Sequence, residues 1–154
     1  MGNGSFSKTT SIISNASNNN TLQITLRGKI LSHLYSSKRF IRVVPDERGN
    51  IQESIDLNTE KANLKITSIY FRENNNEKNK NNTPNWQSNL NLYPNFSVSK
   101  TDTTDADGYY TYKIELIMNI SPSKTLSGNF FFNTNHPQKN VFKIRGIIVS
   151  KNNE

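Results

Sequence analysis

Hydrophobic and polar residues alternate along most of this chain with a period of two. The clearest case is the segment 109–120. Its even positions carry the apolar side chains Tyr110, Tyr112, Ile114, Leu116, Met118 and Ile120. Its odd positions are mostly polar, and Ile117 is the exception. Successive side chains of a strand point to opposite faces of a sheet, so this pattern predicts a long strand with one buried face.

Further segments have the same period or a strand-like composition. Residues 22–31, 51–57 and 63–71 alternate, with the apolar positions Leu22, Ile24, Leu26, Ile30, Ile51, Ile55, Leu57, Leu64 and Ile66. Three segments rich in Phe, Val and Ile predict more strands, and a weaker one completes the set: 39–44, 128–134, 141–149 and 90–98. No segment predicts a helix, since the best candidate, 52–65, has irregular spacing and no cap pair.

Polar turn signals separate these segments. The sequence D-E-R-G-N at 46–50 and the pair Asp107-Gly108 predict turns, and Asn135-His136-Pro137 predicts a tight connection. Residues 73–89 form a long polar insertion of low complexity. Many short strands joined by polar turns favour an all-β sandwich or a small barrel.

Composition narrows the function classes. Among 154 residues there are 25 Asn and no Cys, and the formal net charge is +7. The absence of Cys excludes disulfide scaffolds, thiolate metal sites and Cys nucleophiles. Eight Phe, six Tyr and one Trp argue against a fully disordered chain. No apolar run reaches the ~18 residues that a membrane helix needs, so no membrane insertion is expected.

Two segments of the chain resemble one another. G-N-F-F-F-N-T-N-H-P at 128–137 is followed by V-F-K-I-R-G-I-I-V at 141–149. G-S-F-S-K-T-T-S-I-I-S-N-A-S at 4–17 is followed by T-L-Q-I-T-L-R-G-K-I-L at 21–31. In each, a Gly opens one strand and an apolar-Arg-Gly run lies in the next. The pattern resembles the last two strands of bacterial immunoglobulin-like repeats related to the ASH/hydin group.

This resemblance implies a division of the chain. Residues 32–150 would be one immunoglobulin-like antiparallel β-sandwich, with I-R-V-V-P at 41–45 as its first strand and the polar insertion at about 73–89. Residues 1–31 would be an extra N-terminal β-hairpin, either the tail of a preceding repeat or a hairpin recruited to this domain. The first copy has two more residues between its Asn and its Gly, and the insertion is not part of the family pattern.

The resemblance also implies a function. Such repeats are generally non-catalytic spacers, assembly modules or binding surfaces of larger, multi-repeat proteins. The expected partners are other protein domains, with self-association through an edge strand as one form, and no cofactor is expected. No acid/base pair, nucleophile or phosphate loop points to an enzyme. The chain is expected outside the cytoplasm or at the cell surface if it is cut from a processed precursor, and in the cytoplasm otherwise.

Basic residues supply most of the candidate binding side chains. They form two clusters, Lys38, Arg39 and Arg42, and then Lys139, Lys143, Arg145 and Lys151. Alternation places Lys143 and Arg145 on one face, beside Arg27 and Lys29 if the two similar strands are close. With Tyr109, Tyr110 and Tyr112, these cations suggest an alternative: an OB-type fold that binds single-stranded nucleic acid through cations and stacking rings. Against it, Tyr110 and Tyr112 share the parity of the apolar positions and are expected in the core.

The remaining candidates each have a structural explanation beside the functional one. Trp86, the only Trp, lies in the polar insertion, where it binds a partner or covers the edge of the sandwich. Asp102, Asp105 and Asp107 could supply oxygen ligands to Ca²⁺, but a polar turn is the preferred interpretation. Nothing in the sequence marks a nucleophile or ligand partner for His33 or His136, so both are assigned structural roles.

The N-terminal segment needs a surface to cover its apolar positions. Burial of Leu22, Ile24, Leu26 and Ile30 would stabilise the chain by about 1.5–3 kcal/mol for each fully buried side chain. We therefore expect this segment to pack on the domain that follows it, or on another copy of the chain.

Overall fold

The computed structural model describes residues 4–15, 17–18, 20–74 and 91–150, and these residues form strands and turns without a helix. No helix long and apolar enough to cross a membrane is therefore present in this part of the chain. The strands are β1 (Gly4–Ile13), β2 (Thr21–Ile30), β3 (Leu34–Ser36), β4 (Phe40–Val43), β5 (Asn50–Thr59), β6 (Ile66–Glu73), β7 (Asn91–Leu92), β8 (Asn95–Lys100), β9 (Tyr110–Asn119), β10 (Leu126–Thr134) and β11 (Val141–Ile148).

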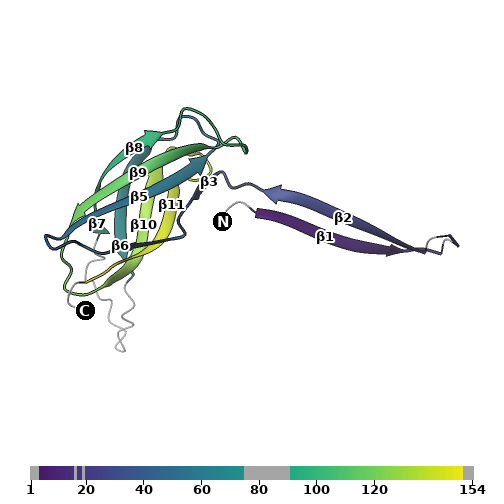
Figure 1. The fold of residues 1–154 in the computed structure, drawn as a ribbon, viewed down its shortest axis with the longest axis horizontal. Coiled ribbons are helices and arrows are strands. Elements are labelled where there is room, and N and C mark those ends of the chain that lie inside the picture. The colour runs from purple at the N-terminus through teal and green to yellow at the C-terminus, as the bar shows by residue number, and fades with distance from the viewer. Residues whose placement is uncertain (1–3, 16, 19, 75–90, 151–154) are drawn as a thin grey trace.

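Two sheets lie face to face and enclose the core (Figure 1). The five-stranded sheet has the order β4-β11-β10-β6-β7, and the four-stranded sheet has the order β3-β5-β9-β8. Neighbouring strands are antiparallel except β4 and β11, which are parallel. The prediction of an all-β sandwich is confirmed.

The core consists of the inward side chains of both sheets. In β9 the buried residues are Tyr112, Ile114, Leu116 and Met118, as the alternation predicts, and the exceptional Ile117 points outward with 54% of its surface exposed. The inward side chains of the five-stranded sheet include Ile41, Phe71, Phe130, Ile144 and Ile148. Large side chains from strands distant in sequence therefore share one continuous core.

A β-bulge in β6 makes the alternation predicted over 63–71 wrong for the residues after Thr67. Asn133 pairs with Ser68 but Thr134 pairs with Ile66, so Thr67 is the extra residue. The buried positions of β6 are consequently Ile69 and Phe71, which have the opposite parity to Leu64 and Ile66. An extra residue on one strand reverses the faces of all side chains beyond it.

The segment 90–98 was predicted as one strand and is two. β7 joins the five-stranded sheet and β8 joins the four-stranded sheet, with Tyr93 and Pro94 between them. Proline has no N–H to donate to a ladder, which suits a position where the chain passes between sheets. The preceding polar insertion, predicted at about 73–89, lies outside the described residues from 75 onward, and β6 includes Glu73.

Two predicted turns share one design. Asp46 Oδ1 accepts hydrogen bonds from the N–H groups of Arg48 and Asn50. Asp105 Oδ1 accepts in the same way from the N–H groups of Asp107 and Tyr109. The third residue after each Asp is a glycine with positive φ, 80° at Gly49 and 83° at Gly108. The pattern D-x-x-G therefore forms the turn at both places because Asp binds the local N–H groups and only Gly adopts this φ without strain.

The hairpin of β1 and β2 is a separate two-stranded sheet that projects from one end of the sandwich (Figure 1). Six of its apolar side chains lie on one face, and 36–62% of the surface of each is exposed: Phe6, Ile12, Leu22, Ile24, Leu26 and Ile30. Ile13 lies on the other face and is 82% exposed. Of the two surfaces expected to cover this segment, the following domain does not do so, and a second copy of the chain stays a prediction. The hairpin points away from the sandwich, so the core of the domain is out of reach of its apolar face.

Candidate functional site

Three predicted binding residues meet on the outer face of the five-stranded sheet. Lys143 and Arg145 alternate with the buried Ile144 in β11, so both point outward. Arg42 pairs with Ile147, two residues further along β11. All three side chains are exposed, and none forms an ion pair with a described residue. We call the outer side chains of β4, β11, β10 and β6 the cationic sheet face.

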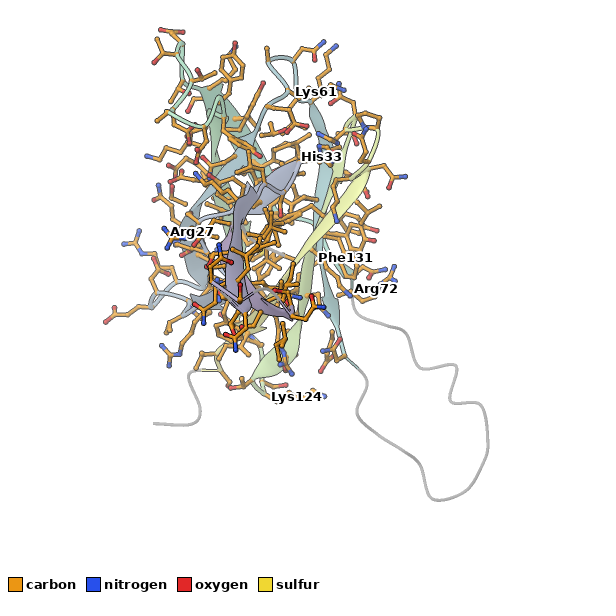
Figure 2. The ribbon with its side chains drawn as sticks, turned by 90° about the vertical axis from the view of Figure 1, so that its right-hand side faces the viewer. Arg27, His33, Lys61, Arg72, Lys124 and Phe131 are labelled. Atoms are coloured by element: carbon orange, nitrogen blue, oxygen red, sulfur yellow. The ribbon has the colours of Figure 1, made fainter. Side chains whose placement is uncertain are left out.

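Aromatic side chains lie on the same face. Tyr70 of β6 pairs with Phe131 of β10, and their rings stack with centroids 4.9 Å apart and 9° between planes. The guanidinium of Arg72 lies 5.3 Å from the ring centroid of Tyr70 and 5.4 Å from that of Phe131. Figure 2 shows Arg72 and Phe131 close together on this side of the molecule. A positive charge over an aromatic ring is attracted by the negative face of that ring.

Tyr70, Arg72 and Phe131 are not among the binding residues that the sequence predicts. Phe131 is flanked by the buried Phe130 and Phe132, so its parity could have identified it as an outward ring. For Tyr70 and Arg72 the signal was hidden, because the bulge at Thr67 reverses the parity that the preceding residues set.

The two sheets differ in charge. The strands of the five-stranded sheet carry Arg42, Arg72, Lys143 and Arg145 against one carboxylate, Glu73, which Lys124 binds at 3.3 Å. The strands of the four-stranded sheet carry Lys100 and Lys113 against Glu53, Asp56 and Glu115. The positive charge carried by the strands of the sandwich is therefore concentrated on the five-stranded sheet, where it would attract anionic partners.

Lys38 and Arg39 lie beside this face in the segment that joins β3 to β4. They line an open groove of about 430 Å³ together with Tyr35, Ser36, Phe142, Lys143 and Ile144. Lys38 forms an ion pair with Glu53 of the neighbouring sheet. Arg39 and Lys143 form no ion pair with the described residues, so their charges remain available in the groove.

Several predicted features lie elsewhere. Trp86 lies outside the described residues. Arg27 and Lys29 belong to β2 in the separate hairpin sheet, so the structure does not place them beside Lys143 and Arg145. The rings of Tyr109 and Tyr112 are buried, so they cannot stack on nucleic-acid bases. The two-sheet sandwich also differs from the five-stranded barrel of an OB fold.

The candidate calcium ligands take part in turn contacts. Asp105 binds the N–H groups of its own turn, and Asp107 forms an ion pair with Lys29 of the hairpin. In the described part of the chain, no group of three His, Asp or Glu side chains has an arrangement that could hold a metal ion. The contacts favour the turn interpretation of Asp105 and Asp107.

The structure brings His33 and His136 together, which the sequence gave no sign of. Their ring centroids are 5.9 Å apart, and Glu60 lies between them. Glu60 Oε1 is 2.8 Å from His33 Nδ1 and 3.6 Å from His136 Nε2. Partial burial by itself raises the pKa of Glu60, but a backbone hydrogen bond, the bond to His33 and the charges of both histidines together hold this pKa below its ordinary value of 4.5.

Glu60→Gln is expected to destabilise the protein at neutral pH and to have no effect in acid. A carboxylate with a depressed folded-state pKa stabilises the fold above its unfolded pKa, and this stabilisation is lost as the pH falls through the folded pKa. The difference in melting temperature between parent and variant should therefore be largest above pH 4.5 and shrink as the pH falls below that value. Glu60 is exposed, so the effect should be about 1 kcal/mol at most. The control, Glu47→Gln, removes an exposed turn carboxylate that forms no ion pair with a described residue. The same pH trend in both variants would contradict the assignment to Glu60.

The sequence matches no protein-family model and no curated protein. The function is therefore inferred from the geometry of the chain itself.

Proposed function

We propose that the chain is a non-catalytic assembly and binding module of a larger, multi-repeat protein. The hairpin of β1 and β2 is the contact to a neighbouring unit in this proposal, and the cationic sheet face binds a partner. The observation that carries the proposal is the apolar face of the hairpin, which no described residue covers.

An uncovered hairpin of this kind needs a partner. A two-stranded hairpin alone is marginally stable at best in water. The chain connects this hairpin to β3. The only ion pair between the hairpin and the described sandwich is that of Lys29 with Asp107. A partner that covered six half-exposed apolar side chains would stabilise the assembly by several kcal/mol, at about 25 cal/mol for each Å² removed from water.

The hairpin is built like the last two strands of the sandwich. In β2, a Cβ on Gly28 would lie 2.6 Å from the ring of Phe6. In β11, a Cβ on Gly146 would lie 2.7 Å from the ring of Phe130. Both glycines follow an Arg, and in both hairpins a Phe ring lies over the glycine. In β10 and β11 that face is buried against the other sheet, so a further β-sheet unit is the natural cover for the same face of β1 and β2.

The strand order supports an immunoglobulin-like type of module. In that fold, strands A, B, E and D form one sheet and strands C, F and G form the other. Here β3-β5-β9-β8 corresponds to A-B-E-D, and β11-β10-β6 corresponds to G-F-C, with β4 and β7 added at the two edges of that sheet. The core lacks the disulfide of antibody domains, since the chain has no Cys. Phe71 and Phe130, with ring centroids 5.0 Å apart, fill the centre of the five-stranded sheet instead.

Ile24→Asp combined with Leu26→Asp is expected to abolish association through the hairpin. The isolated chain offers a second copy as the available partner, so the parent should show a mass that rises with concentration above 17.6 kDa. Two carboxylates on the apolar face would have to lose their hydration in the contact, which is costly. Light scattering over a concentration series measures the mass, and thermal unfolding checks that the sandwich is intact.

The matched control is Ser7→Asp combined with Ser11→Asp, which adds the same charge to the polar face of the same hairpin. It should associate like the parent. If the parent and both double variants have the monomer mass at every concentration, the hairpin is not an assembly surface and the proposal fails.

A further inference from the structure

The edge of β11 is covered by β4 over only half of its length. Phe40–Val43 pairs with Arg145–Ile148, and none of the described strands pairs with residues 141–144 on that side. The reason lies in the path of the chain. It leaves the four-stranded sheet after Ser36 and reaches the five-stranded sheet only at Phe40, so the first half of β11 keeps an open edge.

The backbone groups at this open edge can be assigned from two hydrogen bonds. The N–H of Val149 donates to the carbonyl of Val43, so the backbone N–H and C=O groups of the odd-numbered residues of β11 point toward β4. The N–H of Thr134 donates to the carbonyl of Asn140, so the backbone N–H and C=O groups of the even-numbered residues point toward β10. Because N–H and C=O directions alternate along a strand, the groups of Val141 and Lys143 face the open edge. No described residue bonds to them.

The groove of about 430 Å³ runs beside this edge and supplies side-chain contacts. Phe142 and Ile144 give it an apolar part, and Tyr35 of β3 contributes a ring from the opposite sheet. Arg39 and Lys143 add positive charges that no described carboxylate neutralises, and Lys38 adds a third cation bound to Glu53.

We propose that this groove binds an extended acidic peptide segment, which pairs with the open edge of β11 as an added strand in line with β4. The exposed N–H and C=O groups of Val141 and Lys143 need a partner that both donates and accepts, which a peptide backbone does and a phosphate backbone does not. An edge of four residues accommodates about 13 Å of extended chain. Alternate side chains of the peptide would contact the apolar part of the groove, and its carboxylates would reach Arg39 and Lys143. This inference rests on the proposed binding role of the cationic sheet face, to which Lys143 belongs, and is independent of the assembly contact at the hairpin.

The test uses the full chain and an acetylated hexapeptide that alternates glutamate and valine, titrated by calorimetry. We expect measurable binding that weakens about tenfold or more in Arg39→Glu and in Lys143→Glu, because each reverses a charge in the groove. The control is Arg48→Glu, which makes the same change at an exposed turn residue that lines neither the groove nor the cationic sheet face. It should bind the peptide like the parent.

A second probe separates strand addition from simple charge attraction without changing the protein. The same hexapeptide with N-methyl groups at alternate residues keeps its charges but cannot form one side of a ladder, so its binding should fall about tenfold or more. Equal binding of the methylated and unmethylated peptides, or equal weakening by Arg48→Glu, would overturn the proposal. So would the absence of peptide binding at millimolar concentration. Stronger binding of a short single-stranded oligonucleotide with the same dependence on Arg39 and Lys143 would identify nucleic acid as the occupant and overturn it as well.

Discussion

Replacing Leu116 by alanine is expected to lower the free energy of unfolding by about 2–5 kcal/mol, the usual range for removing a buried leucine side chain. Leu116 is 1% exposed and lies in β9, the central strand between β5 and β8. It belongs to the continuous core that both sheets share, so the surrounding side chains cannot close the cavity without moving strands. Denaturant unfolding measures the change, and an unaltered slope would show that the denatured state is the same.

The neighbouring residue provides the control for this experiment. Ile117 is an apolar side chain of the same size in the same strand, but it points outward and is 54% exposed. Ile117→Ala should change the free energy of unfolding by about 0.5 kcal/mol or less, as expected for a surface substitution. Similar losses at both positions would mean that the two faces of β9 are not distinguished by burial.

Gly128→Ala is expected to destabilise the protein by about 3 kcal/mol or more, at or beyond the upper end of the usual cost of overpacking. Gly128 lies in β10 opposite Glu73 of β6. A Cβ at this position would lie 2.0 Å from the carbonyl oxygen of Arg72 and 2.8 Å from its carbonyl carbon. The obstacle is backbone in the middle of a sheet, which cannot rotate away as a side chain could. The two strands must separate to admit the methyl group, and their hydrogen bonds would lengthen.

The control comes from the resemblance between the two hairpins. Gly4 begins the N-terminal segment of the sequence match as Gly128 begins the C-terminal one, but no described atom lies within 4 Å of a Cβ built on Gly4. Gly4→Ala should leave the melting temperature unchanged within error, whereas Gly128→Ala should lower it by several degrees. If the two substitutions had equal effects, the close approach of β6 and β10 would not be a constraint on this position.

Within the candidate binding site, a local sequence pattern predicts the direction of some side chains but not of others. Alternation in 141–149 correctly placed Lys143 and Arg145 on one face, because the direction of a side chain in a regular strand depends only on its parity. The same argument would assign Tyr70 and Arg72 to the wrong face if it started from Leu64, because the bulge at Thr67 adds a residue. Whether a bulge forms depends on the pairing with β10, more than sixty residues away along the chain.

The exposed hairpin is a second feature that the sequence predicts only in part. The sequence of 22–31 predicts a strand with one apolar face, and the structure confirms both the strand and the face. The sequence does not determine which surface covers that face. Parity is a property of a single strand, but burial is a property of two surfaces in contact, and the second surface is absent from the described sandwich.

The sequence by itself determined most of the strands, the inward and outward positions of β5, β9 and β11, and the turns at Gly49 and Gly108, because each of these depends on residues within a few positions of one another. The tertiary structure alone decided the pairing of β4 with half of β11, the meeting of Arg39 with Lys143 in one groove, and the contact of His33 and His136 around Glu60. These features join residues that are far apart in the chain. Their positions follow from strand order and register, which the packing of the whole core selects and no local pattern encodes.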